Sequence, residues 1–105
     1  MENIDFSQPN FKLDLAIAMS IGWSKSKDDK YHWIRPDGST TNIIPNYSKD
    51  ATLALEALQK IMEIKDIYRS ILDITPDQFI IKIGDATASS STPALAICKS
   101  IYKLL

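Results

Sequence analysis

The stretch that decides the fold runs from residue 31 to residue 62 and reads YHWIRPDGSTTNIIPNYSKDATLALEALQKIM. Residues 31–44 are rich in aromatic and β-branched types on either side of the turn sequence Pro36-Asp37-Gly38-Ser39, so they predict a β-hairpin. Beyond residue 50 the apolar residues recur at helical spacing, which predicts a helix over 48–63 with Ser48 as its N-cap. On the exposed side of this helix, Glu56, Lys60 and Glu63 are expected to face water.

Two further helices flank this central stretch. Asn10 can cap a helix over 10–21, which would end at Gly22. Thr92 followed by Pro93 is a typical start for a helix, here over 93–105, because proline at the first position loses no hydrogen bond. Residues 1–9 have no regular pattern and predict an irregular lead-in.

The remaining segments are less regular. Residues 78–83 include Phe-Ile-Ile-Lys-Ile, a nearly continuous apolar run that predicts a central strand buried on both faces. Between 64 and 75, isoleucines at helical spacing leave two alternatives open, either a continuation of the preceding helix or a new start. The Ala/Ser/Thr run over 86–92 is interpreted as a short polar loop.

Together the elements predict an α+β fold in a single domain over 1–105. Three strings in it, WIRPDG (33–38), PNYSKD (45–50) and ASSSTPALAIC (88–98), resemble the small phage and prophage proteins described as the phage ABA sandwich domain. The resemblance implies a three-layer α/β/α sandwich, in which helices cover both faces of one small sheet of about three strands. On this expectation the hairpin over 31–44 and the strand over 78–83 share that sheet.

Composition narrows the class of protein and its compartment. Twelve basic and thirteen acidic residues give a net charge of −1, so binding to nucleic acid by neutralising many phosphates is not expected. Cys98 is the only cysteine, which excludes an intramolecular disulfide. We find neither a secretory signal nor an apolar run of membrane-spanning length, and therefore expect no membrane partner and a cytoplasmic location. The resemblance to phage proteins implies that this is the cytoplasm of a bacterial host cell.

Catalytic and metal-binding patterns are scarce. His32 is the only histidine, and Cys98 lies beside an apolar helical stripe that favours a buried, inert thiol. We therefore expect no enzyme activity, no cofactor and no bound metal. One alternative stays open, a small metal-dependent nuclease that uses Asp37 and Glu63, although Glu63 falls at a helix end and not on the strand such sites use.

The candidate binding residues fall into two groups. Hydroxyl-rich segments precede two predicted helices, whose N-termini could accept an anion such as a nucleotide phosphate. Alternate residues of the first hairpin strand place two aromatic rings and an arginine on one face, a composition typical of protein interfaces. The candidate residues are Tyr31, Trp33, Arg35, Tyr47, Ser48, Asp50, Ser91 and Thr92.

These groups define the expected function. The sequence predicts a non-catalytic binding module, and the resemblance implies that it is a phage or prophage accessory protein, with a possible role in counter-defence. Its partner would be a host protein held by the aromatic strand face, or a signalling nucleotide held where the helix starts meet. A chain this short would build a deep pocket most easily between two subunits, so a homo-oligomer is a further expectation.

Overall fold

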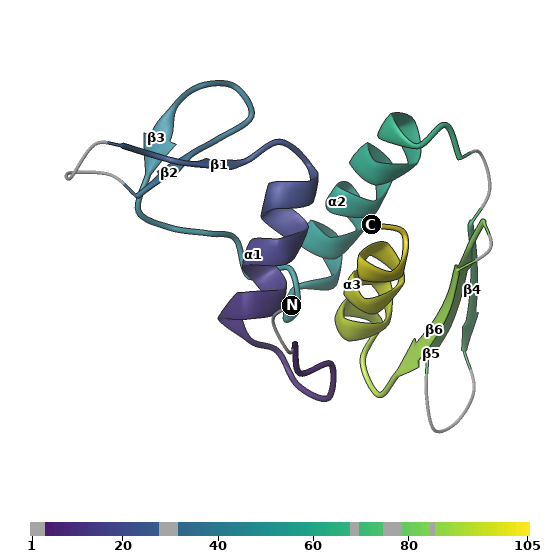
Figure 1. Ribbon diagram of the computed structural model, residues 1–105. Coiled ribbons are helices and arrows are strands. Elements are labelled where there is room, and N and C mark those ends of the chain that lie inside the picture. The colour runs from purple at the N-terminus through teal and green to yellow at the C-terminus, as the bar shows by residue number, and fades with distance from the viewer. Residues whose placement is uncertain (1–3, 28–31, 68–69, 75–78, 85) are drawn as a thin grey trace.

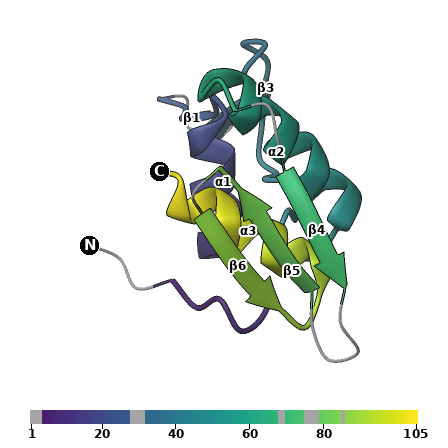
Figure 2. The same ribbon diagram turned by 90° about the vertical axis from the view of Figure 1, so that its right-hand side faces the viewer.

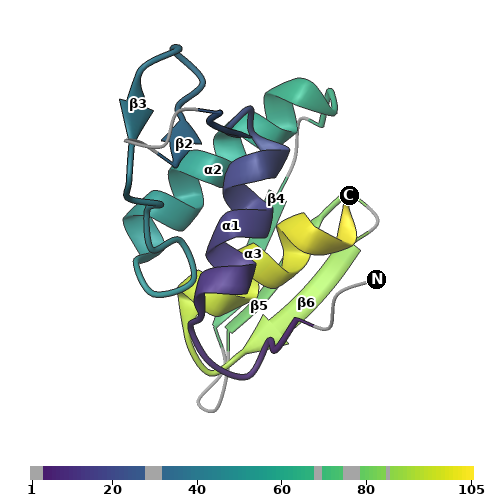
Figure 3. The same ribbon diagram turned by 60° about the vertical axis from the view of Figure 1, so that its left-hand side comes forward.

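The α+β class predicted from the sequence is confirmed by the computed structural model, which describes residues 4–27, 32–67, 70–74, 79–84 and 86–105. The described residues form three helices, α1 (Phe11–Ser20), α2 (Ala51–Ile64) and α3 (Pro93–Lys103). All three begin toward the same end of the molecule (Figures 1 and 3). The predicted helix positions are therefore confirmed to within a few residues at each end.

The strands, however, belong to two antiparallel sheets and not to one. The first sheet has the order β1 (Ser24–Lys25), β2 (Trp33–Ile34), β3 (Thr40–Thr41), and it contains the predicted hairpin. The second has the order β4 (Ser70–Ile74), β5 (Phe79–Ile83), β6 (Ala86–Ser90). The expectation that the hairpin and the strand near 78–83 share a sheet is thus corrected, because both edges of β5 are taken by its neighbours in sequence.

The layers follow from this division. The helix α3 packs on one face of the β4–β5–β6 sheet and α2 packs on α3, and α1 and the hairpin lie on the far side of these helices (Figures 1 and 2). Ile81 and Ile83 are buried, whereas Lys82 between them is exposed. The strand β5 is therefore central, as predicted, but it is buried on one face only. Helices lie between two sheets, in place of the predicted arrangement with one sheet between helices.

The segment after α2 resolves the alternative left open by the sequence. The backbone N–H of Ile67 donates to the carbonyl of Met62 at 2.8 Å, and that of Asp66 donates to Glu63 at 3.3 Å. Asp66 has a positive φ of 57°, so these bonds form a Schellman motif that ends the helix. Residues 70–74 form β4, so within the residues that the structure describes the helix neither continues nor restarts.

The core is built around α3, which is buried along most of its length. It packs on the β4–β5–β6 sheet and on both other helices, so it joins every layer except the hairpin. Its own fully buried positions meet apolar side chains from each of those elements. The largest buried apolar residues of this core are Leu13, Ile17, Ile61, Ile81, Ile83, Leu95, Ile97 and Ile101.

The helix caps confirm two of the three predictions made from local sequence. Asn10 accepts a hydrogen bond from the backbone N–H of Leu13 at 2.9 Å, and Thr92 accepts one from Leu95 at 3.3 Å. At the start of α2 the cap is Asp50, whose carboxylate accepts from the backbone N–H groups of residues 52 and 53. The prediction of Ser48 as the cap is wrong, because Ser48 is engaged elsewhere.

Gly22 ends α1 with a φ of +107°, and an added Cβ would lie in ordinary contact with Pro36, 3.5 Å from its Cβ. The cost of a side chain here is therefore in the backbone. We expect Gly22→Ala to lower the free energy of unfolding by about 1–2 kcal/mol. Gly22→Asn is the control and should lose less, because asparagine adopts positive φ more readily. Urea unfolding measures both, and an alanine variant as stable as the parent would contradict the prediction.

Candidate functional site

Ser48, a predicted ligand residue, is fully buried and bound to α1. Its hydroxyl donates to Oδ1 of Asp14 at 2.6 Å, and its backbone N–H donates to the same oxygen at 2.7 Å. Its oxygen also accepts from the backbone N–H of Asn10 at 3.0 Å. These bonds engage the hydroxyl and the backbone N–H of Ser48 within the protein, and they tie the first turn of α1 to the segment before α2.

The other residues at the predicted anion rim are mostly engaged as caps. The side chains of Asp50 and Thr92 both accept from backbone N–H groups of the helices they precede, α2 and α3. Ser91 is exposed. The two helices do begin toward the same end of the molecule, as the rim requires (Figure 1). Of the hydroxyl side chains predicted here, however, Ser48 is held inside the protein.

The hairpin carries the predicted aromatic face. Tyr31 lies outside the described residues. Trp33 is half-buried, and its ring centroid lies 6.3 Å from that of Phe11 on α1, at an interplanar angle of 50°. Arg35 is exposed, and its Nη1 atom donates to Oγ of Ser39 at 3.0 Å and to the carbonyl of Thr40 at 3.3 Å. The Trp33 ring is therefore directed onto α1, whereas Arg35 contacts its own turn.

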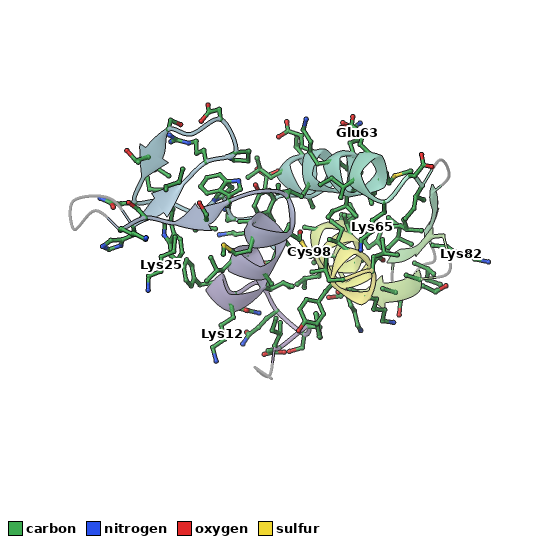
Figure 4. All side chains as sticks on the ribbon, turned by 45° about the horizontal axis from the view of Figure 1, so that its top comes forward. Lys12, Lys25, Glu63, Lys65, Lys82 and Cys98 are labelled. Carbon is green, nitrogen blue, oxygen red and sulfur yellow. The ribbon has the colours of Figure 1, made fainter. Side chains whose placement is uncertain are left out.

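Trp33 contacts Phe11 at one end of an apolar side of α1. We call Trp33 and the residues of this side, Phe11, Leu15 and Met19, the α1–β2 surface. The three residues of α1 lie at i, i+4 and i+8 and so share one side of that helix. Phe11 is 55% exposed and Met19 is 46% exposed. Lys25 is paired directly with Trp33 in the register of β1 and β2, and Lys12 follows Phe11 on α1 (Figure 4).

A separate cavity of about 490 Å³ opens between the hairpin and α2, and sequence reasoning missed it. Tyr47 contributes to its wall and is only 5% exposed. Burial raises the pKa of Tyr47, the charge of Glu56 raises it further, and a hydrogen bond with Trp23 acts in the opposite direction. The lining residues are Ile21, Pro36, Tyr47, Glu56, Ala57, Gln59, Lys60 and Glu63.

The two acids of the nuclease alternative lie on different elements. Asp37 is in the β2–β3 turn, and its Oδ1 accepts from the hydroxyl and the backbone N–H of Ser39 at 2.6 and 2.9 Å. Both bonds lower the pKa of the Asp37 carboxyl, and the bond from the hydroxyl has the larger effect. Glu63 is on α2 and lies 4.0 Å from the Nζ atom of Lys60. The described part of the chain contains no group of three or more His, Cys, Asp or Glu residues that could hold a metal ion.

Cys98 is fully buried in α3, and burial raises the pKa of its thiol to about 12. The thiolate, which is the reactive form, is therefore rare near neutral pH. This confirms the prediction that the thiol is buried, and the raised pKa agrees with the interpretation that it is inert.

Comparison of the chain with protein-family models, curated proteins and solved structures found no match. Among the described helices, none has the length and apolar character needed to cross a membrane.

The contacts of Ser48 lead to a test of its role. Ser48→Ala removes the hydroxyl that links Asp14 to Asn10, so Asp14 keeps only the bond from the Ser48 backbone N–H and the part-buried N–H of Asn10 loses its acceptor. We expect a loss of about 1–3 kcal/mol in the free energy of unfolding, measured with urea. Ser91→Ala, at an exposed serine, is the matched control and should change it by less than about 0.5 kcal/mol. Equal losses in the two variants would contradict a structural role for Ser48.

Burial of Cys98 predicts a pH dependence. In the unfolded chain the thiol ionises near its ordinary pKa of 9.0, whereas in the fold it keeps its proton until about pH 12. Above pH 9.0 the unfolded state therefore loses its proton first, and stability falls as the pH rises through this window. Cys98→Ala lacks the titrating group and should show a shallower fall in the urea midpoint with pH. The prediction fails if both proteins show the same slope.

Proposed function

We propose that the chain is a non-catalytic binding module that captures a protein partner through the α1–β2 surface. The observation that carries the proposal is the pair of rings formed by Trp33 and Phe11. Trp33 is anchored by its packing against the core, and Phe11 remains more than half exposed. Held aromatic side chains with exposed area are the usual centres of protein interfaces, because they bury much surface with little further loss of conformational freedom.

The charges beside this surface indicate the chemistry of the partner. Lys12 follows Phe11 on α1, and Lys25 is paired with Trp33, so two cations flank the apolar side chains. A partner that places an apolar side chain against Phe11 and Met19, with acidic residues next to it, would match both features. The strings over 33–38, 45–50 and 88–98 resemble a phage domain, and support an accessory protein that acts on a host protein in the bacterial cytoplasm.

The protein partner is better supported than a signalling nucleotide. Sequestration of a nucleotide needs a hollow into which helix N-termini and a cation point. Asp50 and Thr92 are engaged as caps at those N-termini, and Arg35 binds within its own turn. The cavity of about 490 Å³ is lined instead by two glutamates and one lysine.

The test uses a partner identified by affinity capture from a bacterial lysate and then purified. Phe11→Ser should weaken binding at least tenfold, because the central apolar contact is lost. Lys25→Glu should also weaken binding, and the loss should be larger at low salt than at high salt because the effect of this substitution is electrostatic. Leu55→Ser is the matched control: Leu55 is a comparably exposed apolar residue, 46%, on α2, and binding should be unchanged.

Fluorescence quenching provides a second measurement. Trp23 is 8% exposed and Trp33 is half-buried, so quenching of the free protein by acrylamide reports mainly on Trp33. Binding of the partner should reduce the quenching of Trp33 by acrylamide. A bound partner whose affinity survives Phe11→Ser would count against the proposal. So would a nucleotide that raises the melting temperature of the parent but not of Arg35→Ala, a result that would favour sequestration.

A further inference from the structure

The cavity beside α2 has the dimensions of a ligand site. Its volume of about 490 Å³ is within the range of pockets that hold small molecules or single side chains of a bound peptide. Apolar groups of Ile21, Pro36 and Ala57 supply part of its wall. These come from the end of α1, the hairpin turn and α2, so the cavity exists only because the hairpin folds against the helices.

Tyr47 brings a hydrogen-bond donor to this wall. The indole N–H of the neighbouring Trp23 can only donate, so Trp23 lowers the pKa of Tyr47 but cannot accept its proton. The described residues provide no acceptor for the phenolic proton of Tyr47. That proton is therefore free to bind a carbonyl oxygen of a ligand.

The opposite wall is acidic. Glu56, Lys60 and Glu63 lie on successive turns of α2 and all line the cavity, which gives these walls a net negative charge. Lys60 is 4.0 Å from Glu63, and both side chains are largely exposed. Within the described part of the chain, Glu56 has no ion-pair partner. Figure 4 shows Glu63 on the outer side of α2, where a ligand can reach it from solvent.

We propose that this cavity binds a basic side chain of an extended peptide, with its cationic group at the carboxylate of Glu56 and a backbone carbonyl at the hydroxyl of Tyr47. Arginine matches best, since its guanidinium forms paired hydrogen bonds with carboxylates and its aliphatic stem packs on apolar walls. The proposal is independent of the α1–β2 surface, which shares no residue with the cavity. A phosphate or carboxylate ligand is disfavoured by the two glutamates that line the cavity.

The test titrates the folded protein with the peptide acetyl-Gly-Arg-Gly-amide and follows the backbone amide signals by NMR. Saturable shifts are expected at Ala57, Gln59 and Lys60. The same peptide with citrulline in place of arginine keeps the shape but lacks the charge, and should bind at least fivefold more weakly. Raising the salt concentration should weaken binding of the arginine peptide alone.

Variants distinguish the cavity from a general charge effect. Glu56→Gln is an exposed substitution that leaves the fold intact, and it should raise the dissociation constant at least threefold. Tyr47→Phe should raise it less, and melting curves check that this variant remains folded. Asp5→Asn removes one negative charge at a residue that does not line the cavity, and should have no effect.

Three outcomes would overturn the proposal. One is equal binding of the arginine and citrulline peptides. Another is equal weakening by Glu56→Gln and Asp5→Asn, which would indicate attraction by net charge alone. The third is the absence of saturable shifts at about 10 mM peptide, well above a dissociation constant in the millimolar range.

Discussion

A buried carboxylate, that of Asp14, fixes the relation between α1 and the segment before α2. One of its oxygens accepts both the hydroxyl and the backbone N–H of Ser48, 34 residues away, and Asn10 joins the same network while it caps α1. Such a carboxylate is tolerated at 8% exposure only because it is hydrogen-bonded. The network closes the loop of chain that leaves α1 at Gly22 and returns at Ser48, and this loop carries the whole hairpin.

The α1–β2 surface and the cavity beside α2 both depend on this closed loop. Tyr47 is adjacent to Ser48, so the network holds it against Trp23 and places it in the cavity wall. The hairpin is held over the helices in turn, with Trp33 against Phe11 on one side and Pro36 over α2 on the other. The strands of this hairpin are two residues each and could not hold their position by their own hydrogen bonds. The contact of Trp33 with Phe11 on α1 adds to those bonds.

The sequence predicted what is local and failed where partners are distant in the chain. The caps at Asn10 and Thr92 were predictable because the hydrogen bonds span three residues. Ser48 has the same local signature but a stronger partner in Asp14, which no short-range pattern reveals. Residues 86–90 resemble a loop by composition, since alanine and serine have low strand propensity, and they form β6 only because β5 provides a ladder to pair with. The division of the strands into two sheets follows from these same pairings.

The candidate sites also depend on contacts between residues that are distant in the sequence. Charged residues at Glu56, Lys60 and Glu63 are what a solvated helix face contains, and only the hairpin above them creates a hollow. Trp33 was identified because period-two alternation is visible in the sequence, whereas its contact with Phe11 is not visible there.

At the β6 edge of the second sheet, Lys103 and Lys99 donate to the carbonyls of Thr87 and Ser89 at 2.6 and 3.5 Å. These bonds occupy acceptors that an added strand would need, so this edge is protected against pairing with another strand.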